Sequence, residues 1–366
     1  MDSLTQITLG AAVGEAVAGR EGRAKAPLWG AFVGTLPDLD VLANPFLTEA
    51  QALLFHRGPS HSLFLALLLS PLLGLALAKL HENGPSWRRW AVMVGAVWLT
   101  HIGLDCLTVY GTQVFWPFTR TPVLFGTIFI IDPLYTVPLA AGLLTALWWD
   151  PSARTRRLAN YAGLALSSAY LLVTIANKAH VNSVFTSSLQ SQTLPAERLL
   201  TKPTAFNNLL WVGISEAEDG FYVGYYSLLD DDRAVAFRYV PKEHHLLGTA
   251  ADNPFVDRLR WFSRGYFIVR QAPDGTLTVQ DIRFGRNDAG LTSEGQYIFT
   301  FRLRRDEAGT VTGFRQVRPE MQLTGPLLRR FVDRVRGQED AVQTGAPGRN
   351  FSVTAPGSLP DSSVAN

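Results

Sequence analysis

Long apolar runs constrain the fold of this chain more than any other feature, and nearly all of them lie within residues 1–178. A helix that crosses a bilayer needs about 20 predominantly apolar residues. The candidate segments are 4–19, 27–42, 61–80, 90–107, 128–149 and 158–175. The run at 61–80 is the clearest. The run at 4–19 contains Gln6 and Glu15, so it could form a half-helix or a re-entrant segment. The sequence predicts an α-helical polytopic membrane domain of five or six helices.

Basic residues are concentrated in alternate loops between these runs. Three loops hold, in turn, Arg20, Arg23 and Lys25, then Lys79, Arg88 and Arg89, then Arg154, Arg156 and Arg157. The other loops hold only Arg57 and Arg120. Because cytoplasmic loops are enriched in Lys and Arg, we expect the basic loops to face the cytoplasm. The chain is thus predicted to be a multi-pass protein of a bacterial inner membrane.

The chain changes character beyond about residue 200. Aromatic and β-branched residues become frequent, and DG, AG and TG pairs separate them as in β-hairpins. The segments that carry this pattern are 211–232, 277–285 and 297–317, and an amphipathic helix is expected at 326–336. We therefore predict a membrane-embedded metal-site domain at 1–178, a linker at 179–199, a smaller β-rich (α+β) soluble domain at 200–337, and a disordered tail at 338–366. The alternation of loops places the soluble domain on the extracytoplasmic side.

Charge and cysteine content exclude several other classes. The formal net charge is only +2, and no block of Lys and Arg is present, so nucleic acid is not an expected partner. Cys106 is the single cysteine, which excludes an intrachain disulfide framework and a CxxC metal site. The opening residues MDSLTQITLG have no basic region before their apolar part, so we expect no removable signal peptide. The bilayer is the expected environment, and the sequence identifies no protein partner.

Six metal-capable side chains lie beside these apolar runs, although Asp and His are costly near lipid. They form three motifs, PDLD, HRGPSH and HIGLD, which contain Asp38, Asp40, His56, His61, His101 and Asp105. All three motifs fall on the face of the poorly basic loops. Imidazoles with carboxylates are ligands for Zn, Mn or Fe. We predict one extracytoplasmic site for a divalent metal ion, Zn²⁺ or Mn²⁺. Asp132 falls on the same face, as a further ligand or as a helix cap.

Each motif also has a purely structural interpretation. His101 and Asp105 are four residues apart, so on a helix they share a face and can bind one ion. The same spacing fits a hydrogen-bonded pair that joins two helices. Asp38 and Asp40 could form a capping turn, and Ser60 or His61 could cap the helix that follows them. The metal prediction depends on the three motifs occurring together on one face.

Four segments, taken in order, resemble one known family. DSLTQITLGAAVGEA (2–16), PDLD, HRGPSHSL and THIGLDCLTVYGTQVFWPF (100–118) are similar to the YdjM-like family of membrane-bound metal-dependent hydrolases. The resemblance covers about the first half of the chain and implies that the six Asp and His residues are metal ligands. Many relatives carry a histidine where this chain has Gln6, so the resemblance leaves the number of ions open. It assigns no activity to the C-terminal region.

The function predicted from these features is metal-dependent hydrolysis of a lipid or lipid-linked (phospho)ester. Asp40 or Asp105 could serve as a general base, and Arg57 could neutralise a substrate phosphate. A second hypothesis is a non-catalytic membrane scaffold or regulator whose His/Asp cluster fixes helix packing. A third, transport of metal ions or protons, predicts ligands spread through the membrane depth rather than gathered at one face.

Overall fold

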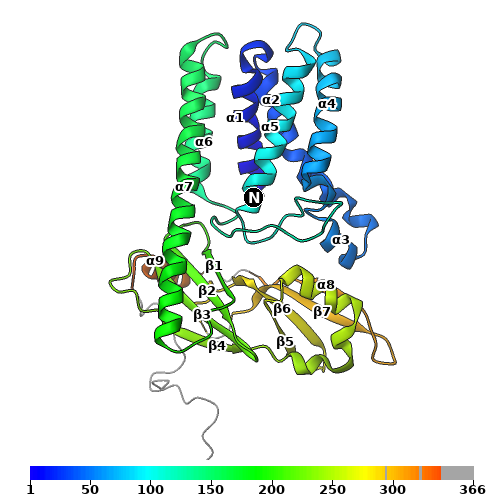
Figure 1. Ribbon diagram of the computed structural model, residues 1–366, viewed down its shortest axis with the longest axis vertical. Helices are drawn as coiled ribbons and strands as arrows, with labels where there is room; N and C mark the ends of the chain where they lie inside the picture. Colours follow the sequence, from blue (N-terminus) through cyan, green and yellow to red (C-terminus); the bar gives the residue numbers. More distant parts are fainter. Residues whose placement is uncertain (293–294, 321–323, 339–366) are drawn as a thin grey trace, which may run out of the picture.

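The fold consists of a helical N-terminal region followed by two antiparallel sheets. The computed structural model describes residues 1–292, 295–320 and 324–338. Six helices run side by side in one half of the molecule, and the sheets lie beyond one end of them (Figure 1). These helices are α1 (Ser3–Gly22), α2 (Lys25–Thr35), α4 (Leu63–Leu80), α5 (Trp87–Cys106), α6 (Pro133–Leu147) and α7 (Arg154–Ser191). A helical region followed by a β-rich region was expected, and this order is confirmed.

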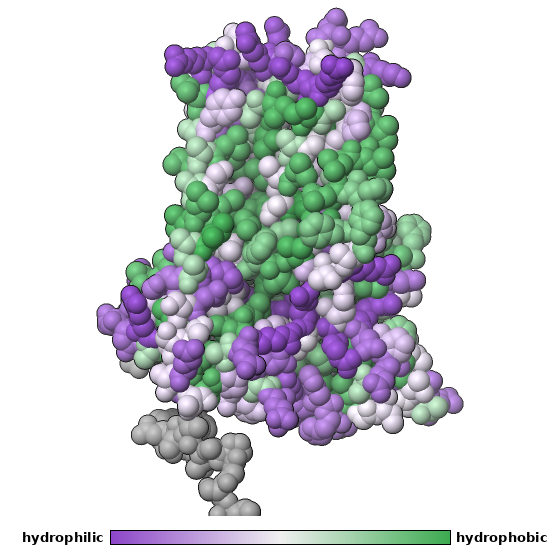
Figure 2. Space-filling view, in the orientation of Figure 1, coloured by the Kyte–Doolittle hydropathy of each residue, from purple (hydrophilic) through white to green (hydrophobic). Residues whose placement is uncertain are grey.

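On the face shown in Figure 2, a hydrophobic surface covers the helices between two hydrophilic ends. Among the described residues, α4 and α7 are the two helices long and apolar enough to cross a bilayer, and α6 is a shorter apolar helix. Only 22% of the most apolar window of α4, and of α7, is buried within the protein. Their apolar side chains therefore face outward, as they do in lipid-facing helices. Two candidate spans are fewer than five or six, so that number stays a prediction.

Several segments differ from their predicted extents. Residues 4–19 belong to a complete helix, α1, which Asp2 begins by accepting a hydrogen bond from the Thr5 amide at 3.0 Å. The segment 27–42 is divided, because α2 ends at Thr35 and a 3₁₀ helix, η1 (Leu36–Phe46), follows. Helix α7 continues to Ser191, so residues 179–191 of the predicted linker are helical.

Helices α1 and α2 touch backbone to backbone through four glycines. A Cβ atom on Gly10 would lie 2.3 Å from the Gly30 carbonyl oxygen, and one on Gly30 would lie 2.2 Å from that of Gly10. Gly14 and Gly34 extend the contact by one helical turn on each side. Small residues four apart allow close approach of membrane helices. The contact fixes α2 against α1 and also places the Gly34 carbonyl oxygen, which lies 2.8 Å from His101 Nδ1 on α5.

A buried ion pair joins α7 to α1. Arg156 donates to both carboxylate oxygens of Glu15, with Nε–Oε1 at 2.6 Å and Nη2–Oε2 at 2.7 Å. Asn160 adds a hydrogen bond from its amide to the Ala12 carbonyl at 2.8 Å. The sequence shows that Glu15 needs a partner within the apolar region, and the structure identifies it as Arg156.

Each sheet has four strands that pair in chain order. The first contains β1 (Leu199–Pro203), β2 (Leu210–Glu216), β3 (Gly220–Ser227) and β4 (Phe237–Pro241). The second contains β5 (Phe267–Gln271), β6 (Leu277–Arg286), β7 (Tyr297–Arg305) and β8 (Val311–Val317). The hairpins expected at 211–232 and 297–317 are confirmed as β2–β3 and β7–β8, with Gly213 opposite Gly224 in the first. Strands β1, β4 and β5 lie outside the predicted segments.

Shorter helices complete the described chain. They are α3 (Glu49–Phe55), η2 (Pro59–His61), η3 (His244–Asp252), α8 (Pro254–Ser263) and α9 (Gly325–Val335). Helix α9 confirms the amphipathic helix expected at 326–336. The tail predicted at 338–366 lies, apart from residue 338, outside the described residues.

The sheets contact the loops at one end of the helices. Asn208 donates to the Thr127 carbonyl at 2.8 Å, and the Gln316 amide donates to a Glu49 carboxylate oxygen at 2.6 Å. The ring of Tyr110, in the loop after α5, lies 5.4 Å from the ring of Phe262 and 5.8 Å from that of Phe284. The two regions are therefore joined by polar and aromatic contacts as well as by α7.

Loss of Arg156 should destabilise the protein more than loss of its neighbour. In R156L the Glu15 carboxylate is left buried without a partner, which typically costs about 3–5 kcal/mol. We expect a clearly lower thermal unfolding temperature for detergent-purified R156L than for R157L, which removes an exposed arginine. The double variant E15L/R156L should recover much of the loss, because no buried charge remains. Equal unfolding temperatures for R156L and R157L would contradict this account.

Candidate metal centre

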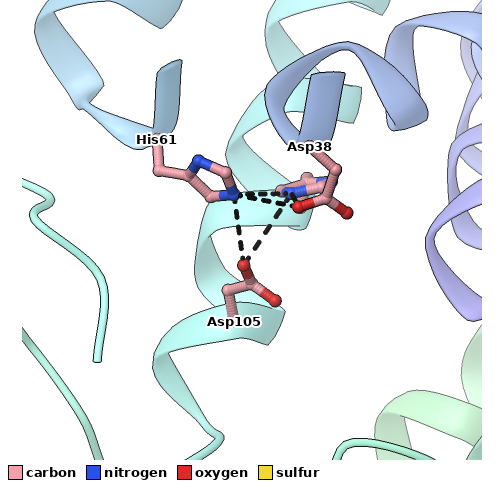
Figure 3. A group of neighbouring side chains, drawn as sticks. Asp38, His61 and Asp105 are labelled. Atoms are coloured by element: carbon pink, nitrogen blue, oxygen red, sulfur yellow. Dashed lines mark hydrogen bonds and ion pairs between the residues drawn. The ribbon is translucent and has the colours of Figure 1, made fainter. Parts of the chain in front are cut away.

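Four predicted ligands converge on one point at the end of the helices nearest the sheets. Asp38 lies near the start of η1, His61 ends η2, and His101 and Asp105 lie in the last turns of α5. One ligand atom from each lies within 4.8 Å of every other (Figure 3). Asp38 is 22% exposed at its side chain, while the other three side chains are almost completely buried. A solvent molecule or a ligand would therefore reach the four-residue group from the side of Asp38.

Two imidazole nitrogens and two carboxylate oxygens face one another. His61 Nε2 lies 3.3 Å from Asp38 Oδ1 and 3.3 Å from Asp105 Oδ2. His101 Nε2 lies 3.2 Å from His61 Nε2, 3.7 Å from Asp38 Oδ1 and 3.9 Å from Asp105 Oδ2. His101 and Asp105 therefore share a face, as their spacing of four residues predicts.

The backbone of α2 orients His101. Its Nδ1 lies 2.8 Å from the Gly34 carbonyl oxygen. A carbonyl oxygen can only accept, so Nδ1 carries the proton, and the lone pair of Nε2 points at the other three ligand atoms. A histidine that binds metal usually donates its second N–H in this way. The glycine contact between α1 and α2 supplies the acceptor.

A carboxylate and a hydroxyl orient His61 from behind. Ser60 Oγ lies 3.0 Å from His61 Nδ1 and donates to Asp40 Oδ2 at 3.1 Å. Asp40 Oδ2 itself lies 3.7 Å from His61 Nδ1. Trp98 holds this loop by donating from its indole N–H to the Ser60 carbonyl at 2.8 Å. Ser60 was not among the predicted site residues, although its place beside His61 was a signal for it.

Asp40 and His56 lie next to the four-residue group but outside it. Asp40 Oδ1 is 2.9 Å from His56 Nδ1, and Asp40 Oδ2 accepts a hydrogen bond from the Arg57 amide at 3.0 Å. Both oxygens of Asp40 thus have hydrogen-bond partners on the side of His61 that faces away from the other ligand atoms. His56 keeps 27% of its side chain exposed. The structure places these two predicted residues behind the ligand atoms, where they contact His61 and solvent.

Asp105 has one oxygen with donors and one without. Its Oδ1 accepts from the Met1 amino group and from the Gln6 side chain, the latter at 3.3 Å. Its Oδ2 faces His61 and is buried, and no described residue donates a hydrogen bond to it. Arg57 Nε lies 3.3 Å from the same oxygen. A buried carboxylate oxygen without a donor is costly, and a metal ion would remove that cost.

Arg57 is buried beside Asp105 rather than exposed to lipid head groups. It donates from Nη1 to Thr108 Oγ1 at 3.2 Å, and its guanidinium lies 4.6 Å from the centre of the Tyr110 ring. Tyr110 and Thr108 were not predicted, and no spacing rule indicates a loop residue of this kind. The arginine brings a fixed positive charge to the edge of the ligand group.

The donor set fits a divalent ion in both chemistry and size. A tetrahedral zinc site has bonds of about 2.0–2.2 Å, which puts its ligand atoms roughly 3.3–3.6 Å apart. Five of the six separations among the four ligand atoms run from 3.2 to 3.9 Å, and all six lie within 4.8 Å. Two nitrogen and two oxygen ligands suit Zn²⁺ or Mn²⁺. The four residues form a cluster that could hold a metal ion.

Two other polar residues have structural partners elsewhere. Asp132 caps α6 by accepting from the Leu134 amide at 3.0 Å, and it accepts from the Tyr170 hydroxyl at 2.8 Å. Of its two expected roles, the structure shows the helix cap. His81 lies in the loop between α4 and α5, where it accepts from the Trp29 indole at 2.8 Å. Neither belongs to the four-residue group.

Comparison with known proteins agrees with the motifs. Residues 1–181 match the family model described as YdjM inner membrane protein. No curated protein and no solved structure matches the chain. All three ligand motifs lie within the matched residues. Through residues 1–181, the chain belongs to the YdjM inner membrane protein family.

Proposed function

We propose that this protein is an integral membrane metal-dependent hydrolase. The convergence of Asp38, His61, His101 and Asp105, with one Asp105 oxygen left without a donor, carries the proposal. A network built only for packing would supply hydrogen-bond donors to both oxygens of a buried carboxylate. Here one oxygen faces two imidazole nitrogens and the guanidinium of Arg57. Arg57 pairs with this oxygen at 3.3 Å without donating a hydrogen bond to it, and a bound cation would give the oxygen the close partner that it lacks.

The position of the cluster supports a lipid or lipid-linked (phospho)ester as substrate. We propose that the six helices that lie side by side, the short α2 included, are embedded in the bilayer and that the basic loops face the cytoplasm. The cluster lies at the opposite ends of the helices, next to the sheets (Figure 1). It is then extracytoplasmic, at the level where the apolar surface ends. A scissile ester near the head groups of a lipid would meet the site at that level.

Each side chain of the site has its own role in this proposal. Asp38, His61, His101 and Asp105 would hold Zn²⁺ or Mn²⁺, which supplies Lewis-acid chemistry when bound. Arg57 would neutralise a phosphate on the substrate. Asp40 would orient His61 through Ser60. Asp40 is also hydrogen-bonded to His56, which is partly exposed, so a proton could pass between Asp40 and solvent through His56.

The metal content of the purified protein tests the ligand assignment. We expect a stoichiometric amount of zinc or manganese in the wild type and background amounts in H61A and D105N, since each loses one of four ligands. H81A is the matched control, because His81 lies in the loop between α4 and α5, and it should keep the metal. Elemental analysis by mass spectrometry measures all four proteins. If H61A and D105N fold and still contain as much metal as the wild type, the proposed ligand site is ruled out.

The orienting role of Asp40 predicts a smaller effect. D40N keeps the shape of the side chain but weakens its hold on Ser60 and His61. Loss of such an outer partner typically lowers metal affinity about 10–100-fold. Competition with a chelator of known affinity should show this shift, with full loading restored at high metal concentration. An unchanged dissociation constant would contradict the role.

Hydrolysis is tested with the metal-loaded protein in lipid nanodiscs. The wild type should cleave a chromogenic phosphodiester or a carboxylic ester, and H101A should lose both metal and activity. A specific observation favours the scaffold alternative: His101 joins α5 to the Gly34 carbonyl of α2 at 2.8 Å. If the wild type cleaves neither ester class and H101A only unfolds at a lower temperature, the scaffold function is the better account.

A further inference from the structure

A second site lies in the sheet region, apart from the metal centre. A partly open cavity of about 400 Å³ is lined by residues of both sheets, helix α9 and the loop that precedes α6. Its walls are mainly apolar, with Val223 from one sheet, Ile282 from the other and Phe331 from α9 among them. The volume falls within the range of small-molecule sites, about 300–1,000 Å³. An apolar cavity of this size can hold one hydrocarbon chain.

The wall of the cavity carries a buried lysine, Lys202. Lys202, on β1, is only 6% exposed, and no described residue forms a hydrogen bond or ion pair with it. Burial lowers the pKa of Lys202 to about 8, although the charge of Asp281 acts in the opposite direction. The side chain therefore remains mostly protonated at neutral pH. A buried ammonium group without an anion is costly.

Other charges at the cavity have the same sign. Arg238 and Arg286 line it with Lys202, and no Asp or Glu is among the described lining residues. Arg286 pairs with Asp288 at 3.1 Å, but its buried Nε has no hydrogen-bond partner in the described part of the chain. The site thus combines apolar walls with unpaired donors. That combination matches a molecule with a hydrocarbon chain and an anionic head.

The rim of the cavity is apolar and exposed. Ile131 is 41% exposed, and Phe206 and Leu328 are each 52% exposed. Ile131 lies two residues before α6, one of the helices within the hydrophobic surface of Figure 2. Exposed apolar residues around a cavity mark a surface that meets lipid or a partner. Their place beside the start of α6 favours the membrane surface.

We propose that this cavity binds a single-chain anionic amphiphile, with its acyl chain between the sheets and its carboxylate or phosphate head on Lys202. A neutral chain would leave the ammonium unpaired, and a small soluble anion would leave the apolar walls without contacts. The proposal does not depend on hydrolysis at the metal centre. Phe284 lines the cavity and contacts Tyr110 at 5.8 Å, so an aromatic pair separates the two sites.

The test uses the full-length protein in nanodiscs of phosphatidylcholine. A palmitate analogue with a photoreactive diazirine is added, and labelled peptides are identified and quantified by mass spectrometry. We expect labels on strands and loops that line the cavity. K202M should reduce labelling about 10- to 100-fold, the loss expected for a buried charge-assisted hydrogen bond. V223F, which fills part of the cavity, should also reduce it.

Controls separate binding from folding and identify the head group. K242M is the matched variant, because Lys242 pairs with Glu216 at 2.8 Å and does not line the cavity; its labelling should equal that of the wild type. K202M should unfold at the same or a higher temperature than the wild type, since it loses an unpaired buried charge. Competition by oleate indicates a carboxylate head, and competition by oleoyl lysophosphatidate indicates a phosphate head.

Three results would overturn the proposal. In the first, K202M folds and is labelled as strongly as the wild type. In the second, neutral oleyl alcohol competes as well as both anions. In the third, all labels lie on the transmembrane helices. The experiment measures binding alone. Its failure would therefore leave the hydrolase proposal intact, and absence of hydrolysis would leave this one intact.

Discussion

The contact between α1 and α2 is the constraint on which the geometry of the His/Asp cluster depends. Four glycines let the two backbones touch, with a Cβ on Gly30 only 2.2 Å from the Gly10 carbonyl oxygen. That closeness sets the position of Gly34, whose carbonyl fixes the ring of His101. It also places Gln6 against Asp105. A larger residue at Gly10 or Gly30 would separate the helices and move a ligand's orienting group, so packing and chemistry are coupled at this point.

Much of the site could be predicted because its residues follow simple rules. The spacing of His101 and Asp105 places them on one helical face, and loop charge places the three motifs at one end of the helices. The division between ligands and supporting residues could not be predicted. It depends on a 3₁₀ segment at Asp38 and on the positive φ of 56° at Arg57, which turn Asp40 and His56 behind His61.

The fold was predictable to a similar extent and for similar reasons. Apolar runs and turn pairs locate most helices and the hairpins β2–β3 and β7–β8. Hydropathy falls after residue 175, while α7 continues to Ser191 because apolar residues spaced along its last turns still pack on the first sheet. Phe185, for example, lies against Gly213 and belongs to the same buried cluster as Trp211. The partner of Glu15 is 141 residues away in sequence. No local pattern encodes a pair so distant.

The length of α7 has a mechanical consequence. Its 38 residues extend about 57 Å at 1.5 Å per residue, and a bilayer core takes up only about 30 Å of that. The helix is continuous, so it provides no hinge between the two regions, and in the proposed membrane orientation it would hold the sheets at a fixed height above the membrane surface. If the protein acts on a lipid as proposed, lateral diffusion within the bilayer is the shortest approach to the His/Asp cluster, because the sheets lie beyond that end of the helices. Encounter would then depend on the surface density of the lipid rather than on its concentration in water.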